Sequence, residues 1–169
     1  MLVTHDALDA LTLADEVLVL VDGTVVERGR PVDVLADPAH PFTAALGGTN
    51  LLLGTVADDA SGPAVVTADG LRVPCPPGLR AGTLARLTFA PSAVEAHRAA
   101  TAHEPATGVV RWETRVVDLE PGTTGVRVRT SGDILVDVRP ADLAVLDLQV
   151  GAPLVLAVPH TEQRLRPLS

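Results

Sequence analysis

Short apolar runs separated by turn-forming residues are the feature that most limits what this chain can fold into. The run Val17–Val21 is followed by Asp22-Gly23 and then by a second β-branched run, Thr24–Glu27. An Asp-Gly pair between two such runs is a strong signal for a two-residue β-hairpin. No apolar run approaches the roughly 20 residues that a membrane-spanning helix requires. The pattern therefore predicts short strands, and any membrane association is expected to come through a partner.

The chain changes character near Gly47-Gly48. Before that point strand and helix patterns alternate, with helices expected over Asp6–Ala14, Val32–Ala36 and Phe42–Leu46. After it, strands dominate, apart from one helical turn expected at Pro140–Val145. We therefore expect a mainly β protein preceded by a short α/β segment. The strands expected after Gly48 are Leu51–Val56, Pro63–Thr67, Leu71–Val73, Thr83–Phe89, Gly108–Asp118, Gly125–Thr130, Ile134–Val138 and Pro153–Val158.

The β part shows a weak internal repeat. Asn50–Val56 opens one half and Thr107–Val110 opens the other. Each half closes with an apolar strand and a polar tail, in Leu87–His97 and in Val155–Leu165. Two halves of roughly 50–60 residues imply two small barrels side by side. The expected organisation is an incomplete α/β unit at residues 1–47, a first lobe at 48–98 and a second lobe at 108–169, with a linker between the lobes.

Charge and composition narrow the function classes. The formal net charge is −8, and the 13 basic residues are all arginines, with no lysine and no basic cluster. Non-specific nucleic-acid binding depends on neutralised phosphates, so no nucleic-acid partner is expected. Cys75 is the only cysteine, which rules out an intrachain disulfide and fits a reducing cytosol. His97, His103 and His160 share no metal-ligand spacing, so no metal site is expected.

The first quarter of the chain carries an ordered series of motifs. An apolar run ends in Thr4-His5-Asp6, a helical segment with Asp9-Ala10 follows, and Ala14-Asp15 leads into the hairpin and a closing Glu27-Arg28-Gly29. This order resembles the switch-histidine loop of ABC ATPases and the elements that follow it, except that Glu16 stands where the family usually has arginine. Residues 1–47 therefore look like the remnant of an ABC nucleotide-binding domain, and the chain resembles the C-terminal part of an ABC-transporter ATP-binding subunit.

The resemblance implies a role for His5 as the switch histidine, which in a complete ATPase reaches the γ-phosphate of ATP. ATP and Mg are implied as cofactors only for the complete family member, and none is expected for this chain alone. A phosphate-binding P-loop needs a lysine, and this chain has none. The chain alone is therefore not expected to hydrolyse ATP. The resemblance also implies a cytoplasmic position at the inner face of the cell membrane, with an ABC permease subunit and a second ATP-binding subunit as partners.

The remainder resembles TOBE domains, and more closely their molybdate-binding, Mop-like kind. Asn50–Val56 fits the opening Asn-x-Leu-x-Gly-x-Val, Phe89–Val94 fits the closing motif of the first half, and Leu146–Val158 fits the corresponding run of the second half. The resemblance implies an OB-like β-barrel, a possible homodimer through the TOBE domains, and molybdate or tungstate as a ligand. The candidate anion-binding residues that it implies are Asn50, Ser92, Thr101 and Thr161.

Two departures from the Mop-like pattern affect the expected ligand chemistry. Oxyanions are held by hydroxyls, backbone N–H groups and cationic side chains. Glu104 stands where the family has a neutral amide, and the closing Val-Lys-Ala-Thr is replaced by Val158-Pro159-His160-Thr161, which removes its lysine. Both changes work against molybdate binding.

Two functions stay open on the sequence. The first is part of an ATP-binding subunit of an importer for molybdate or a related oxyanion, with a TOBE domain for assembly or solute sensing. The alternative is a free-standing oxyanion-binding storage or sensor protein. A third idea, a hydrolase using His5 with Asp6 or Asp9, lacks any nucleophile motif.

Overall fold

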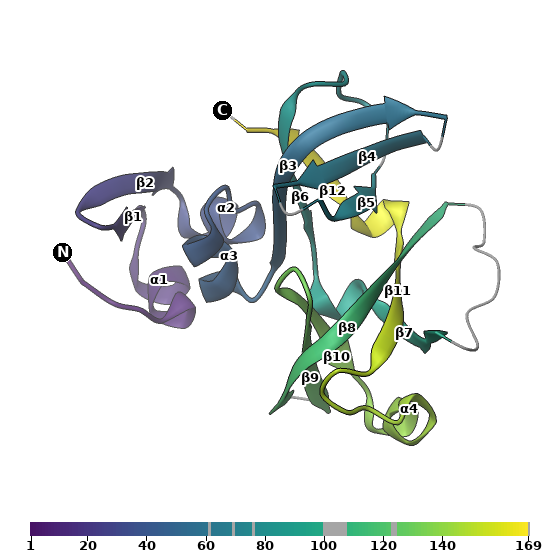
Figure 1. Ribbon diagram of the computed structural model, residues 1–169. Helices are drawn as coiled ribbons and strands as arrows, with labels where there is room; N and C mark the ends of the chain where they lie inside the picture. Colours follow the sequence, from purple (N-terminus) through teal and green to yellow (C-terminus); the bar gives the residue numbers. More distant parts are fainter. Residues whose placement is uncertain (61, 69, 76, 100–107, 123–124, 169) are drawn as a thin grey trace.

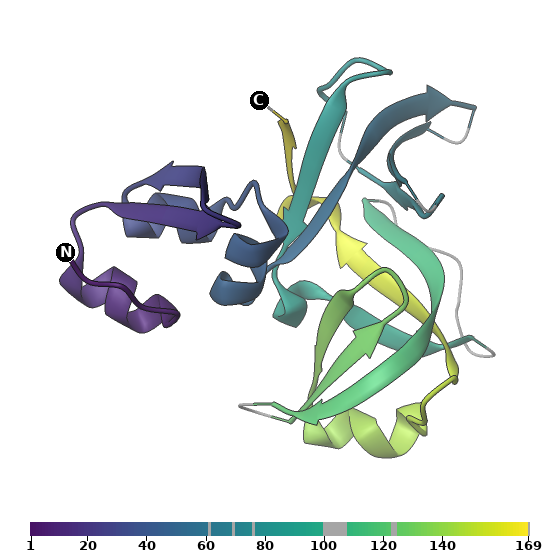
Figure 2. The same ribbon diagram turned by 60° about the vertical axis from the view of Figure 1, so that its left-hand side comes forward.

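The computed structural model describes residues 1–60, 62–68, 70–75, 77–99, 108–122 and 125–168. A small N-terminal unit of helices and one hairpin is followed by a larger part built from two curled five-stranded sheets (Figure 1). Figure 2 shows the N-terminal unit projecting to one side of the β part, with the amino terminus at its far end. The expectation of a mainly β protein preceded by a short α/β segment is confirmed.

The N-terminal unit comprises α1 (Ala7–Leu13), β1 (Val17–Val21), β2 (Thr24–Gly29), α2 (Pro31–Ala36) and α3 (Pro41–Gly47). Asp6 caps α1 by accepting a hydrogen bond of 2.7 Å from the backbone N–H of Leu8. Asp22 and Gly23 both have positive φ, as a type I′ hairpin turn requires, so the predicted hairpin is confirmed. The apolar run just before His5 forms no strand: residues 2–4 are exposed and pair with no other described strand.

The β part contains two antiparallel sheets of the same strand order. The first sheet runs β12-β6-β3-β4-β5 and the second runs β7-β11-β8-β9-β10. In the first sheet the strands are β3 (Asn50–Asp59), β4 (Gly62–Thr67), β5 (Arg72–Pro74), β6 (Leu84–Phe89) and β12 (Arg164–Pro167). In the second sheet they are β7 (Glu95–Arg98), β8 (Val109–Pro121), β9 (Val126–Thr130), β10 (Ile134–Val138) and β11 (Pro153–Pro159). A helix, α4 (Pro140–Leu146), follows β10 at the place of the expected helical turn.

The two halves exchange their last strands. In the first half, β6 leads through a short 3-10 turn, η1 (Pro91–Ala93), into β7, and β7 pairs with β11 of the second sheet. In the second half, β11 leads through η3 (His160–Glu162) into β12, and β12 pairs with β6 of the first sheet. Both segments were expected only as polar tails, and the structure shows that each polar tail forms a short strand. The exchange means that neither sheet is complete without a strand from the other half.

The division into lobes at residues 48–98 and 108–169 stays a prediction about domains. The hydrogen-bonded sheets do not follow it at two strands, since β7 and β12 each belong to the sheet of the other half. The apolar core likewise runs through both halves without a break. Its buried members include Leu52 and Leu87 from the first sheet and Val128 and Leu156 from the second. One shared core and two exchanged strands therefore join the halves into one packed unit.

Phe89 and Trp112 meet in this shared core. Their rings lie 6.1 Å apart between centroids in an edge-to-face arrangement, and Trp112 is 7% exposed. Trp112 therefore belongs to the buried core. Phe89 and Trp112 are the only Phe, Tyr or Trp residues of the β part, so this is its only contact between two such rings.

Gly54, in the opening motif of the first half, sits where strand β4 passes very close to β3. A Cβ atom at this position would lie 2.3 Å from the backbone oxygen of Val66. A second close approach occurs at Gly125, just before β9, where a Cβ would lie 2.1 Å from the backbone oxygen of Val138 in β10. Any side chain at either position would force the two strands apart, so these glycines permit the tight curl of each sheet. None of the helices in the described ranges is long and apolar enough to cross a membrane.

Candidate functional site

His5 lies on the surface, in the bend that precedes α1. Its neighbours form local hydrogen bonds: the Thr4 hydroxyl donates to Asp9 Oδ2 at 2.9 Å and accepts from the Asp6 N–H at 3.0 Å. These bonds shape the turn and leave the His5 imidazole exposed. Two carboxylates, Asp6 and Asp9, stand close to it in the chain. A phosphate here would need positive charge supplied from elsewhere.

Asn50 is buried at the start of β3 and is fully engaged with the other half. Its Nδ2 donates to the backbone oxygen of Leu135 at 2.8 Å, and its Oδ1 accepts from the Leu135 N–H at 2.7 Å. Leu135 lies in β10, so the amide of Asn50 acts as a short extra piece of strand between the two sheets. The equivalent position of the second half is Val110, because Asn50 pairs with Phe89 and Val110 pairs with Val158. Valine has no side-chain amide, so the second half has no equivalent of the contact between Asn50 and Leu135.

Ser92 and Thr161 occupy equivalent places in the two halves. Ser92 lies in η1 and Thr161 in η3, and both side chains are exposed. Each turn comes directly before an exchanged strand. The structure places Ser92 at the same end of the first sheet as Asn50, three residues after the strand partner of Asn50. Thr161 lies at the corresponding end of the second sheet, and Thr101 lies outside the described residues.

The turn η3 is tied to the start of β8, since the His160 N–H donates to the backbone oxygen of Gly108 at 2.8 Å. His160, which belongs to the closing motif that has lost its lysine, is half-buried at this contact. A half-buried imidazole can donate one hydrogen bond to an anion when neutral and carries a positive charge only when protonated. Hydroxyls on both turns and this imidazole are thus the donors that the described chain offers near the predicted anion positions.

Gln163 is a buried polar residue that sequence reasoning missed. It follows η3, it is 7% exposed, and neither Oε1 nor Nε2 has a hydrogen-bond partner among the described residues. Its equivalent in the first half is Val94, which belongs to the apolar core. A polar tail in the sequence offers no signal that one of its members would be buried.

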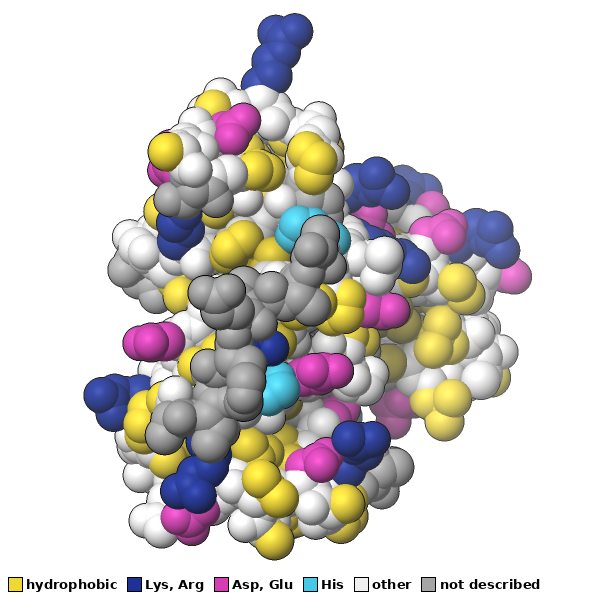
Figure 3. Space-filling model, turned by 90° about the vertical axis from the view of Figure 1, so that its right-hand side faces the viewer, with side chains coloured by type: hydrophobic (Ala, Val, Ile, Leu, Met, Phe, Trp, Pro, Cys, Tyr) yellow, Lys and Arg dark blue, Asp and Glu magenta, His cyan; other side chains and the backbone are white. Residues whose placement is uncertain are grey.

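Two shallow hollows lie at the second sheet, and neither is lined by Asn50, Ser92 or Thr161. One of about 300 Å³ contains Arg98 and Asp147, whose charged groups approach to 3.6 Å. The other, of about 290 Å³, contains Thr114 and Arg115, and Arg115 Nη1 donates to the backbone oxygen of Gly151 at 3.1 Å. Acidic and basic side chains alternate over the face shown in Figure 3 instead of gathering into a patch of one sign. These hollows therefore lack the concentrated positive charge that would select an oxyanion.

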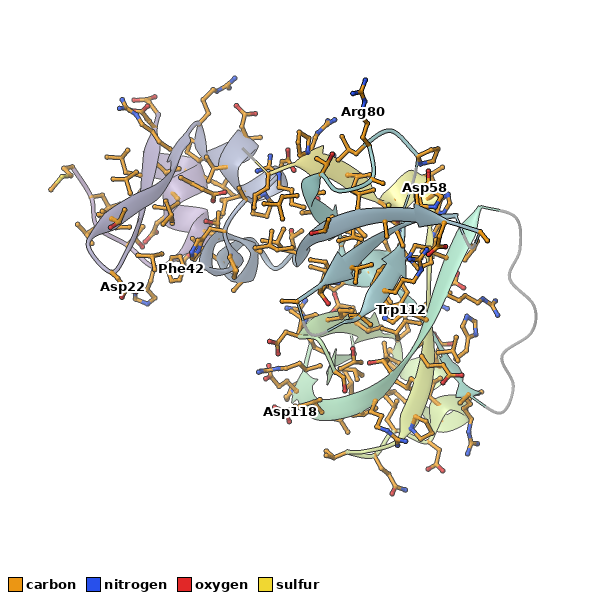
Figure 4. All side chains as sticks on the ribbon, turned by 45° about the horizontal axis from the view of Figure 1, so that its top comes forward. Asp22, Phe42, Asp58, Arg80, Trp112 and Asp118 are labelled. Atoms are coloured by element: carbon orange, nitrogen blue, oxygen red, sulfur yellow. The ribbon has the colours of Figure 1, made fainter. Side chains whose placement is uncertain are left out.

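Two further titratable groups, Arg127 and Cys75, lie in structural positions. Arg127 forms two hydrogen bonds with Asp137 across β9 and β10, at 2.8 and 3.1 Å, and this partner raises the pKa of the Arg127 guanidinium. Burial raises the pKa of the Cys75 thiol. Trp112 points into the space between the sheets, whereas Arg80 extends into solvent (Figure 4). Within the described parts of the chain, no three His, Cys, Asp or Glu side chains are grouped as metal ligands.

Comparison with known proteins finds similar sequences among import ATP-binding proteins. The chain is 52% identical over 60 residues to the molybdenum import ATP-binding protein ModC of Mycobacterium tuberculosis, a match covering 36% of this chain and 16% of ModC. The spermidine/putrescine import ATP-binding protein PotA of Pseudomonas fluorescens is 34% identical over 92 residues, covering 53% and 26% of the two chains. The chain is related to the ATP-binding subunits of ABC importers.

A third relative is the sn-glycerol-3-phosphate import ATP-binding protein UgpC of Burkholderia mallei, 44% identical over 75 residues that cover 43% of this chain and 20% of UgpC. The chain thus spans about a quarter or less of the length of these relatives. No model of a known protein family matches it. The predicted resemblance to ABC importer subunits is confirmed.

The fold has a solved counterpart. The chain superimposes on the cytoplasmic molybdate-binding protein ModG with a TM-score of 0.55, at 16% identity, over 69% of this chain and 94% of ModG. At this identity the likeness concerns the fold. It confirms the mainly β, OB-like fold that was expected for the β part.

Proposed function

We propose that this chain is the C-terminal part of an ATP-binding subunit of an ABC importer for molybdate or a related oxyanion. The observation that carries the proposal is the combination of sequence similarity to ModC with a ModG-like fold in one chain. In this proposal the β part is a TOBE domain that senses the solute or holds the assembly together. The oxyanion would meet hydroxyl and backbone donors near η1 and η3, with Ser92 and Thr161 as the hydroxyl candidates there. Thr101 stays a candidate from the sequence alone.

ATP chemistry would have to be supplied by residues outside these 169. The chain contains no lysine and no Gly-x-x-x-x-Gly-Lys loop, and the groups beside His5 in the sequence are carboxylates. The residues present therefore do not fit a bound nucleotide. His5 takes the role of switch histidine only within a complete ATPase, where other segments would hold ATP and Mg.

The surface of the N-terminal unit supports a place in a larger assembly. Leu8, Leu18 and Leu20 are 66%, 53% and 60% exposed, which is unusual for leucines that lie on one small unit. A complete nucleotide-binding domain would cover this apolar surface. The same proposal places the assembled subunit on the cytoplasmic face of the membrane, beside a permease subunit and a second ATP-binding subunit, with contact between TOBE domains of two copies.

Isothermal titration of the purified chain with molybdate, tungstate and sulfate, and with ATP as a control, tests the proposal. Heat from molybdate or tungstate that is lost in Ser92→Ala with Thr161→Ala would support an oxyanion sensor. Absence of heat with every oxyanion would remove the solute-sensing role and leave an assembly role. Binding of ATP by the chain alone would contradict the argument from the missing lysine.

A free-standing oxyanion-binding protein is the second candidate. It is favoured by one observation: the likeness to ModG extends over 94% of that whole protein. This alternative predicts a closed oligomer that binds oxyanions in a fixed ratio without any permease. Light scattering with and without molybdate separates the two, because a closed oligomer with several anions per assembly would favour storage over import.

A further inference from the structure

The outer face of the first sheet carries three arginines that face the end of α2. Arg86 of β6 and Arg166 of β12 are direct cross-strand partners, and Arg164 lies two residues before Arg166 on the same face. Like charges side by side on neighbouring strands repel each other unless an acid lies between them. The structure supplies that acid from a different part of the chain.

Asp37, the C-terminal cap of α2, lies between the two paired arginines. Its Oδ2 is 3.0 Å from Arg86 Nη2 and 3.9 Å from Arg166 Nε. Arg164 Nη1 also donates to the backbone oxygen of Ala36, at 3.4 Å. Side chains at this contact are partly shielded, with Arg86 19% and Asp37 28% exposed, so the charges are screened less than at an open surface. Strand β12 therefore touches the end of α2 through two of its four residues.

This contact joins three parts of the molecule. Asp37 belongs to the N-terminal unit and Arg86 to the first half, whereas Arg166 is on the strand contributed by the second half. Because β12 continues from β11 through η3, a change in the position of η3 moves β12. A moved β12 changes the position of Arg166 and Arg164 against α2. A displacement in the second half can thus be transmitted through strand β12 to the N-terminal unit.

The polar atoms of this interface are incompletely paired. Asp37 Oδ1 and Arg86 Nε are buried without a hydrogen-bond partner among the residues that the structure describes. The same holds for the hydroxyl of Thr88 in β6, a residue that is 2% exposed and is the strand partner of Arg164. Unpaired buried polar groups weaken a contact relative to a fully satisfied one. An interface of this kind can rearrange more easily than the apolar core behind it.

We propose that Asp37, Arg86 and Arg166 form a clasp through which the position of the exchanged strand β12 sets the position of the N-terminal unit. Its use in an importer, where solute in the β part would influence the ATPase part, rests on the proposed function. The clasp itself does not, since it concerns contacts within this chain. When the clasp is broken, the end of α2 loses its ion pairs with the first sheet, and Arg166 of β12 loses its acidic partner.

Hydrogen exchange of the full chain without any ligand tests the clasp. In Asp37→Asn, amide exchange in residues 41–47 and 164–167 should accelerate together by about fivefold, the effect of losing one partly shielded ion pair. Exchange in β9 and β10, which do not touch Asp37, should stay unchanged. Arg80→Gln, which removes an exposed arginine of the same half, is the matched control and should change neither segment.

A double-variant comparison distinguishes a clasp from three independent contacts. If Asp37 and Arg86 act together, Asp37→Asn with Arg86→Gln should accelerate exchange no more than the stronger single variant. Additive acceleration would overturn the proposal, as would faster exchange in residues 41–47 with no change in β12. Both results are obtained without molybdate, so the two proposals are tested independently. A titration without oxyanion binding would contradict the proposed function but not the clasp, and unchanged hydrogen exchange would contradict the clasp but not the proposed function.

Discussion

Asn50 and Leu135 lie 85 positions apart in the chain and are joined by two hydrogen bonds, of 2.8 and 2.7 Å, between the Asn50 amide and the Leu135 backbone. The amide thus completes backbone pairing at the junction of the two sheets. An asparagine at the start of a strand was expected to be an anion ligand, and that role remains a prediction. In the described fold both ends of its amide already have partners.

Asn50→Ala is expected to destabilise the chain by about 2 kcal/mol, because it removes two hydrogen bonds and leaves the N–H and C=O of Leu135 unpaired. Urea unfolding followed by the emission of Trp112, the only tryptophan, measures the change. Ser92→Ala, at an exposed site of the same sheet end, should shift stability by less than about 0.5 kcal/mol. Equal effects of the two substitutions would contradict the structural role assigned to Asn50.

Gly54→Ala is expected to cost about 2–4 kcal/mol, because its Cβ would lie 2.3 Å from the Val66 backbone oxygen and the strands would have to separate. The midpoint of thermal or urea unfolding reports this loss. Thr55→Ala, at the next and more exposed position, is the control. A Gly54→Ala variant as stable as the parent chain would show that β3 and β4 do not approach as closely as described.

Gln163→Leu is expected to stabilise the chain by about 1 kcal/mol, since it replaces a buried amide that has no partner among the described residues with an apolar group of similar size. Its equivalent in the first half, Val94, already has an apolar side chain in the core. The measurement is the urea midpoint, with Gln163→Glu as the opposite change and a lower midpoint expected. A lower midpoint for Gln163→Leu would mean that the amide has a partner that matters for stability.

The pH dependence of stability above neutrality should report Cys75. Burial raises the pKa of this thiol in the folded chain, so the unfolded chain, with a thiol pKa of about 8.5, loses its proton first. Stability is therefore full below about pH 8.5 and falls as pH rises toward the folded pKa, by at most about 1.4 kcal/mol per pH unit.

The chain has no tyrosine and no lysine, so apart from the amino terminus Cys75 is the group that titrates in this window. Cys75→Ala should flatten the profile between pH 8 and 10, at the cost of a lower stability throughout. A profile that stays equally steep in Cys75→Ala would assign the pH dependence to another group.

Much of the local structure followed from the sequence. The hairpin at Asp22-Gly23 was predictable because both residues tolerate positive φ and the flanking runs favour strands. The short helices around Pro31 and Pro41 were predictable for a similar reason, since proline suits the first turn of a helix. The motif position of Gly54 was also visible, although not the strand contact that explains the glycine.

The short polar strands β7 and β12 were the main error. Their sequences, Glu95–Arg98 and Arg164–Pro167, lack the alternating apolar pattern by which a strand is found. They are strands because an edge of the opposite sheet offers them backbone hydrogen bonds, and such an edge exists only after the sheets have formed. The burial of Gln163 and the Asp37 contact follow from the same event.

By itself, the sequence determined the mainly β class, the turn positions, the internal repeat and the relationship to ABC importer subunits, because these depend on neighbours within a few residues or on motif order. Tertiary structure alone decided that the halves exchange strands, that Asn50 bonds to Leu135, and that Asp37 meets Arg86 and Arg166. These contacts join residues up to more than a hundred positions apart. They depend on which sheet edges are open when the two halves meet.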